Sequence, residues 1–178
     1  MSEAVDKIIE WTKAAQDYDA VQWDRMPEID LYMDQVITYT DKQLQLFQRS
    51  ENNKLLTPSM INNYVKDGLI PRPDHKKYSR NHIARLMMIC LLKQVLSIPD
   101  IALLVGSLWE DSEADILHDT FCAAQKAALS EVCDRVSETA PRGETDLKRL
   151  ALALAIEANA RRIAAERILS ELEKSDEP

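Results

Sequence analysis

Two prolines, Pro71 and Pro73, divide the middle of this chain. Proline has no amide hydrogen to give to a helix, and its ring clashes with the preceding helical turn, so no helix runs through them. The chain must therefore form one helix that ends before this point and another that begins after it. Capping residues and apolar spacing predict these helices over 58–67 and 80–95, with a loop over 70–78 between them.

The helix predicted over 58–67 has two chemically different faces. It begins at the N-cap Thr57, with a proline in the first helical position, and it ends at Gly68. At about 100° per residue, four residues fall on the side that we expect to pack inward: Ile61, Tyr64, Val65 and Gly68. The opposite side carries Ser59, Asn62, Asn63 and Lys66. Such groups suit base edges and phosphates, although an ordinary hydrated helix surface has the same composition.

The loop over 70–78 leaves a basic tip. Leu69 and Ile70 can anchor its start, and Tyr78 can return it to the core. The polar side chains that remain for a partner are Arg72, His75, Lys76 and Lys77. Arg80, the first residue of the next helix, completes the set of candidate DNA-binding residues. That next helix contains seven consecutive apolar residues over 86–92, so we expect it to be buried on nearly all sides.

The charge of the chain is distributed unevenly. Its net charge is −8, yet the segment from Lys54 to Lys93 has eight Lys and Arg against two Asp, a net charge of +6 that leaves −14 for the rest. Such asymmetry suggests that one face meets a polyanion while the remainder repels non-specific partners. A solvated basic surface without a function would give the same charge pattern.

The residues before the basic segment predict three further helices. An amphipathic helix over 3–16 is followed by a connector that a proline breaks, and a second helix begins after Asp30 or Tyr32. The sequence Thr-Asp-Lys-Gln at 40–43 has the form of a capping box, which predicts a separate short helix over 41–49.

The residues after the apolar helix complete the order of a known DNA-binding arrangement. Ser97 caps a helix over 98–105, which we expect to stop at Gly106. The chain thus presents a helix, a polar connection, a short helix with a polar outer face, a basic loop, a buried helix and a short helix. This is the order of a winged helix-turn-helix.

Specific motifs strengthen this interpretation. Tyr64, then Gly68-Leu69-Ile70-Pro71, then Tyr78-Ser79 and a helix rich in Leu and Ile resemble the DNA-binding domain of the MerR family. The stretch SIPDIALLV at 97–105 resembles the next element of that family. The resemblance implies a recognition helix over about 58–67 in the major groove and a wing over about 70–78 on phosphates.

A closer resemblance is to a bacterial family of unknown function. That family contains DLYMDQV, found here at 30–36, and MINNYVKDGLIP, found here at 60–71, followed by KKYS at 76–79. The resemblance covers about 30–106, and the domain is regarded as MerR-like, with no activity implied. The chain has Asn62-Asn63-Tyr64 where MerR proteins usually have an arginine before an aromatic pair, and its wing is shorter.

The C-terminal third predicts a helical hairpin. Helices over 113–138 and 144–173 are joined by a turn at 140–143. The second of them carries two apolar stripes, and one hairpin partner can cover only one. The other stripe, formed by Leu152, Ile156 and Ile163, is explained equally well by a second subunit or by cover from the helix over 3–16.

Several classes of protein are excluded or disfavoured. No apolar run approaches the roughly 20 residues that span a bilayer, and the acidic N-terminus does not resemble a secretory signal. Three cysteines, an odd number in apolar stretches, indicate reduced, buried thiols in a cytoplasm. His118 and Cys122 could meet a metal from one helix, but no third ligand lies at motif spacing. No motif for phosphate, dinucleotide or nucleophilic chemistry occurs, so we expect no enzyme, metal or cofactor.

The sequence thus predicts an all-α protein with at most a two-stranded ribbon at the wing, around 69–78. Its parts are an N-terminal helix and connector (1–29), a MerR-like winged helix-turn-helix (30–106) and a C-terminal hairpin (107–178). The favoured function is a cytoplasmic transcriptional regulator that binds double-stranded DNA, as a homodimer formed through the C-terminal helices. The alternative is a non-catalytic protein-interaction module that kept a winged-helix scaffold without binding DNA.

Overall fold

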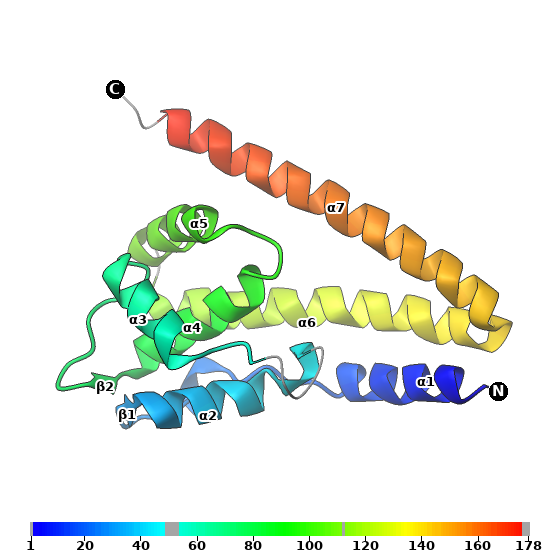
Figure 1. The fold of residues 1–178 in the computed structure, drawn as a ribbon, viewed down its shortest axis with the longest axis horizontal. Coiled ribbons are helices and arrows are strands. Elements are labelled where there is room, and N and C mark those ends of the chain that lie inside the picture. Colours follow the sequence, from blue (N-terminus) through cyan, green and yellow to red (C-terminus); the bar gives the residue numbers. More distant parts are fainter. Residues whose placement is uncertain (1, 49–53, 112, 176–178) are drawn as a thin grey trace. The chain divides into compact units, whose positions relative to one another are not determined.

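The computed structural model describes residues 2–48, 54–111 and 113–175. These residues form a mostly helical protein, as predicted, with a short two-stranded sheet (Figure 1). The helices are α1 (Glu3–Gln16), α2 (Met33–Gln43), α3 (Pro58–Lys66), α4 (Arg80–Leu92), α5 (Ile98–Asp111), α6 (Ala114–Thr139) and α7 (Glu144–Ser175). The strands are β1 (Leu31–Tyr32) and β2 (Lys77–Tyr78), and the 3₁₀ turns are η1 (Trp23–Arg25), η2 (Gln45–Phe47) and η3 (Ala140–Arg142).

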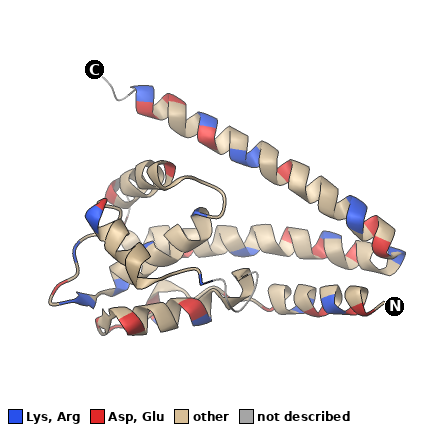
Figure 2. Cartoon of the chain, viewed as in Figure 1, with Lys and Arg blue, Asp and Glu red and all other residues tan. Residues whose placement is uncertain are grey.

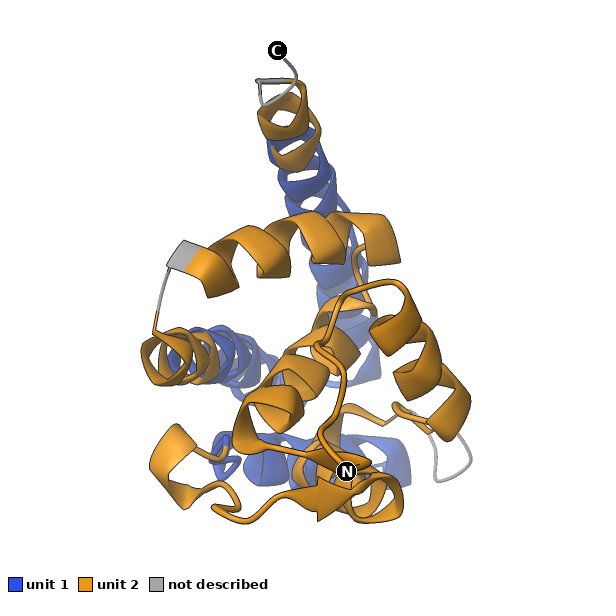
Figure 3. Ribbon diagram, turned by 90° about the vertical axis from the view of Figure 1, so that its left-hand side faces the viewer, with its two compact units in different colours: residues 1–20, 123–168 blue, residues 21–122, 169–178 orange. Residues whose placement is uncertain are grey.

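The chain divides into two compact units (Figure 3). One comprises residues 1–20 and 123–168, and the other comprises residues 21–122 and 169–178. Helices α6 and α7 each contribute to both units. The predicted recognition helix and wing belong to the second unit.

Helix α4 forms the centre of the second unit. Its residues Leu86–Cys90 are all buried, so the expectation of a helix surrounded by core is confirmed there, while Leu91 and Leu92 are half-buried. Around it pack buried residues from α2, α3 and α5, among them Val36, Ile61 and Ile101. The same core also contains Val21, Met26 and Trp109, which lie outside the predicted limits of 30–106.

The two-stranded sheet forms between segments that are far apart in the sequence. Strand β1 pairs antiparallel with β2, with Leu31 opposite Tyr78 and Tyr32 opposite Lys77. The expected ribbon lay within 69–78, and only the bridge between Asp74 and Lys77 forms there. Because two prolines interrupt the first half of the wing, its last residues pair with the strand before α2 instead.

Two predicted helix boundaries are wrong for the same reason. Helix α2 continues through Thr40, which was expected to cap a separate helix over 41–49, and only η2 follows; residue 49 lies outside the described residues. Thr40 is fully buried, one turn after Val36, so core packing holds it inside the helix. Helix α5 continues through Gly106, because Val105 and Trp109 on either side of it are buried in the core.

The first unit is built from α1 and a helical hairpin. The hairpin helices α6 and α7 match the predicted ranges to within about two residues, and η3 joins them through Gly143 at φ +99°. Arg135 and Glu157 connect the two helices by a bidentate ion pair, with both N···O distances 2.7 Å. In the described part of the chain, no helix is long and apolar enough to cross a membrane.

Candidate nucleic-acid interface

Helix α3 has well-defined ends. At its start, the Thr57 hydroxyl accepts a hydrogen bond from the Met60 amide at 3.3 Å, as the sequence predicts. At its end, the Gly68 amide donates to the Val65 carbonyl at 3.3 Å and the Leu69 amide to the Tyr64 carbonyl at 2.9 Å. This paired closure is a Schellman motif, with Gly68 at φ +77° where a side chain would be strained. The helix and the loop after it are therefore rigidly joined.

The two faces of α3 largely follow the prediction. Ile61 and Tyr64 are buried and Val65 is half-buried. Gly68 was expected on the inward face and is instead exposed, because it lies beyond the last helical turn and serves the left-handed cap. All four predicted outer residues are exposed, namely Ser59, Asn62, Asn63 and Lys66.

The wing ends in a tight turn over 74–77. The Lys77 amide donates to the Asp74 carbonyl at 2.7 Å, and His75 and Lys76 both have positive φ, at 46° and 63°. Turns of this kind favour Asn-Gly, so two ordinary residues here place the backbone under strain. Arg72, His75 and Lys76 are exposed, and Figure 2 shows blue Lys and Arg segments along this loop. The His75 Nδ1 atom lies 2.8 Å from the Asp74 carboxylate.

Lys77 and Arg80 differ from the other predicted site residues because the fold uses their side chains. The Lys77 ammonium lies 5.4 Å from the centre of the Tyr32 ring, a cation–π contact across the sheet. The Arg80 guanidinium donates to the carbonyls of Met26 and Pro27, at 3.2 and 3.4 Å, and stacks 5.6 Å from the Trp23 ring. Arg80 therefore ties α4 to the connector, and we leave it out of the proposed contact set.

Two more cations of the basic segment are used internally. The Arg85 guanidinium lies 4.6 Å from the Trp109 ring, and burial lowers its pKa, opposed by the charge of Glu110. Lys93 donates its ammonium to the Leu55 carbonyl, next to the start of α3. Four of the eight basic residues are thus left exposed, namely Lys54, Lys66, Arg72 and Lys76, and Lys77 is half-buried against the exposed Tyr32 ring. The excess of positive charge on this surface is smaller than the sequence suggests.

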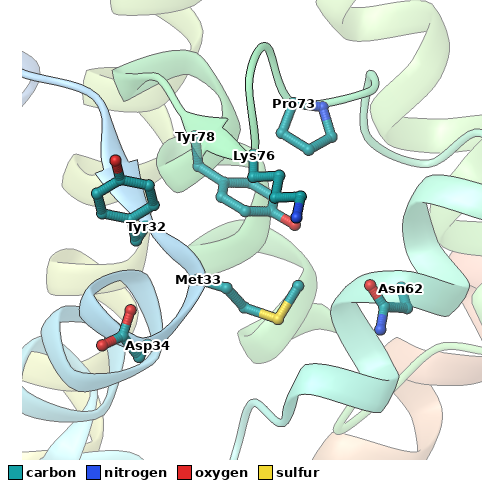
Figure 4. Close-up of a pocket in the computed structure, with 7 residues that line it drawn as sticks. All are labelled: Tyr32, Met33, Asp34, Asn62, Pro73, Lys76 and Tyr78. Carbon is teal, nitrogen blue, oxygen red and sulfur yellow. The ribbon is translucent and has the colours of Figure 1, made fainter.

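A groove separates α3 from the wing (Figure 4). It has a volume of about 520 Å³ and is lined by Tyr32, Met33, Asp34, Asn62, Pro73, Lys76 and Tyr78. Asn62 and Lys76 stand on opposite sides of it, so the structure brings together the two predicted kinds of contact, the helix face and the wing tip. Its third side comes from the start of α2, which was not among the predicted site residues.

His82 holds the base of the wing. Its Nδ1 atom accepts a hydrogen bond from the Ser79 amide at 3.1 Å and lies 2.8 Å from the Ser79 hydroxyl oxygen. Its ring meets the Tyr78 ring edge-on, with centroids 5.7 Å apart. Burial lowers the pKa of His82 by more than the nearby backbone carbonyls of Arg72 and Pro71 raise it. One imidazole thus joins the start of α4 to the end of the wing.

His118 and Cys122, the pair considered for a metal, lie in the interior. The His118 Nε2 atom is 2.8 Å from the Val21 carbonyl oxygen, and the Cys122 sulfur is 3.5 Å from the same nitrogen. Among the described residues, no group of three or more His, Cys, Asp or Glu could hold a metal ion. The three cysteines, all within the described residues, are buried and form no disulfide, and burial raises the pKa of Cys90 to about 12.

Comparison with known families shows to which family the domain with this groove belongs. The model of a family described as a domain of unknown function, DUF1836, matches residues 21–121, which is more than half of the chain. The chain belongs to the DUF1836 family. The matched range agrees closely with residues 21–122, the main part of the second compact unit. No curated protein and no solved structure matches the chain.

Within the DUF1836 domain, sequence reasoning missed the residues that the start of α2 contributes to the groove. Tyr32, Met33 and Asp34 lie 24 to 26 residues before the start of α3 at Pro58. They reach the groove because β1 pairs with β2, and strand pairs of two residues carry no alternating pattern that would reveal them. The motif DLYMDQV, which spans these residues, was the available signal.

Proposed function

We propose that the DUF1836 domain is a MerR-like winged helix-turn-helix that binds double-stranded DNA and acts as a transcriptional regulator. Helix α3 occupies the major groove, and the wing lies on the phosphate backbone. The order β1, α2, α3, wing, β2, α4, α5 supports this arrangement, since it places a short polar-faced helix and a basic loop beside a buried helix.

One observation carries the proposal. Asn62, on the exposed face of α3 that also carries Ser59 and Asn63, lines one groove with the exposed wing cation Lys76. Asparagine amides can bind adenine edges by two hydrogen bonds, and flexible cations bind phosphates of any sequence. The proposed phosphate contacts are Lys66, Arg72, Lys76 and Lys77, with His75 beside them at the tip of the wing.

The proposal is tested by selecting duplexes from a random library with the purified full chain, and then measuring fluorescence anisotropy over a salt series. Four phosphate contacts predict a slope of log K against log salt of about −3 to −4 for each protomer. A selected duplex should bind more tightly than random duplex at every salt concentration. Absence of binding to any duplex at low salt would contradict the proposal.

A protein-interaction module is the second candidate, and a separate observation favours it. Ile29 is 74% exposed and Tyr32 is 51% exposed, and both are apolar groups beside α2 that a protein partner would cover. If no duplex binds, this candidate takes precedence. It then predicts that Ile29→Ser abolishes binding to the partner without lowering the stability of the domain.

We also propose that the protein is a homodimer joined through its C-terminal helices. Leu152, Ile156 and Ile163 on α7 are 64%, 62% and 52% exposed. Helix α1 was the other explanation for this stripe, but it faces a different part of α7: Val5 and Ile8 share a pocket with Leu147, Lys148 and Ala151. A twofold dimer would present two recognition helices to two half-sites.

A further inference from the structure

The groove between α3 and the wing contains an anion as well as a cation. Of its lining residues, Lys76 is basic and Asp34 is acidic. Asp34 is the second residue of α2 and lies at the edge of the groove, while Lys76 comes from the wing (Figure 4). A surface that met only phosphates would gain nothing from a carboxylate at this place, because like charges repel.

The Asp34 carboxylate is free to accept hydrogen bonds. Its side chain is exposed, and none of the ion pairs or hydrogen bonds in the described part of the chain uses its carboxylate oxygens. The N-terminus of α2 favours a negative charge at this position. Asp34 is therefore an exposed acceptor at the edge of the groove that Asn62 also lines.

A carboxylate discriminates sharply between the groups that DNA presents. It repels phosphates, and as an acceptor it also rejects the guanine O6 and N7 atoms and the thymine O4 atom. The groups that it does bind in the major groove are the exocyclic amino groups, N4 of cytosine and N6 of adenine. With α3 in the major groove, the groove beside it is thus suited to a base edge that carries an amino group.

On the basis of the DNA binding proposed above, we propose that Asp34 is a specificity-determining residue that accepts a hydrogen bond from a base amino group. It also weakens binding to duplexes that lack this group, since an unsatisfied carboxylate then lies close to phosphates. The positive residues around it set the strength of binding, and Asp34 with Asn62 sets the choice of sequence.

A charge-matched pair of variants tests this role. Asp34→Ala and Asp67→Ala each remove one exposed carboxylate from the same domain, but Asp67 is the C-cap of α3 and does not line the groove. Affinity for a selected and a random duplex is measured for each variant and for the wild type. Asp34→Ala should reduce the ratio of the two affinities by about 5- to 150-fold, the range expected for one good base contact. Asp67→Ala should change this ratio less than twofold.

The amino group itself is then removed from the DNA. Each adenine of the selected site is replaced in turn by purine, and each cytosine by 2-pyrimidinone. At one position the wild type should lose at least fivefold in affinity, while Asp34→Ala loses less than twofold, and the base at that position identifies the amino group. Asp34→Asn, which keeps one acceptor oxygen without the charge, should retain part of the discrimination.

Each outcome has a separate meaning. If the variants at positions 34 and 67 change both affinities by the same factor, Asp34 contributes only net charge and the inference is wrong, although DNA binding stands. If the wild type binds no duplex, the proposed function fails and the inference fails with it. Helix content and melting temperature of Asp34→Ala must match those of the wild type. If they do not, the ratio of affinities for the selected and the random duplex is compared between Asp34→Asn and the wild type instead.

Discussion

Lys76 occupies a strained position at the tip of the wing. Both it and His75 have positive φ, which costs an L-amino acid about 1–2 kcal/mol per residue relative to glycine. The turn also carries exposed polar and charged side chains, so these residues contribute to the surface although their backbone is strained. The two contributions of Lys76, its charge and its strain, can be separated by substitution.

Lys76→Gly should raise the free energy of unfolding by about 1 kcal/mol, because glycine adopts positive φ without a steric penalty. Lys76→Ala removes the same charge but keeps the strain, so its stability should stay close to that of the wild type. Urea denaturation measures both. Equal stability of the two variants would show that the turn stores no strain at this residue.

The contribution of the wing charges to DNA binding is tested by comparing Lys76 and Lys77 variants with an Arg80 variant as the control. Lys76→Ala and Lys77→Ala should each make the salt slope of DNA binding shallower by about one unit and weaken all duplexes alike. Arg80→Ala should instead lower stability and leave the slope unchanged, because its guanidinium is bonded to Met26 and Pro27. A slope that falls equally in all three variants would return Arg80 to the contact set.

His82 makes the stability of the domain depend on pH. Burial lowers its pKa below the ordinary 6.5, so between the two values the unfolded chain binds a proton that the folded chain does not. The contribution of neutral His82 to the free energy of unfolding is therefore fully present above about pH 6.5. It decreases as the pH falls from there toward the pKa of His82 in the folded protein.

His82→Gln should remove this part of the pH dependence, since glutamine at the third helical position can still accept from the Ser79 amide. The free energy of unfolding is measured between pH 5 and 8 for the wild type, for His82→Gln and for the exposed control His75→Gln. Only the His82 variant should flatten the curve near pH 6. If it keeps the wild-type slope, another group is responsible.

At the scale of the element, α3 depends on its inward face for stability and on its outward face for recognition. Tyr64→Ala removes a side chain that is 5% exposed and belongs to the core, so it should cost about 3–5 kcal/mol. Asn62→Ala and Asn63→Ala change exposed positions and should alter stability by less than about 0.5 kcal/mol. They should instead cost about 1–3 kcal/mol of discrimination between selected and random duplexes.

These three variants are compared by denaturation and by anisotropy on the same duplexes. If the asparagine variants discriminate as well as the wild type, α3 does not read the bases. If Tyr64→Ala is as stable as the wild type, the inward face contributes less than its burial implies.

At the scale of the whole molecule, the exposed stripe on α7 predicts self-association. Ile156→Glu with Ile163→Glu places two charges on the stripe and should produce monomers. Ile168→Glu is the matched control, because Ile168 is 60% exposed but lies about 140° around the helix from Ile163. Analytical ultracentrifugation measures the three proteins, and a wild type that sediments as a monomer at high concentration would contradict the dimer.

Local chemistry was sufficient to locate most helices and the polar face of α3. The cap at Thr57, the stop at Gly68 and the two prolines act within a few residues, so they can be read directly along the chain. Where a core contact opposed such a local signal, the core contact was decisive: Thr40 and Gly106 are both inside helices that continue through them. The reason is that burial of neighbouring apolar residues outweighs a single capping preference.

The composition of the candidate site depended on pairing across long distances in the sequence. The pairing of Leu31 with Tyr78 brings Asp34 into the groove. Contacts of Arg80, Arg85 and Lys93 with rings and carbonyls remove three charges from the surface that a count of residues would include. A count of charges or a motif spacing does not say which way each side chain points. Only the folded chain determines which side chains face outward, where a partner can contact them.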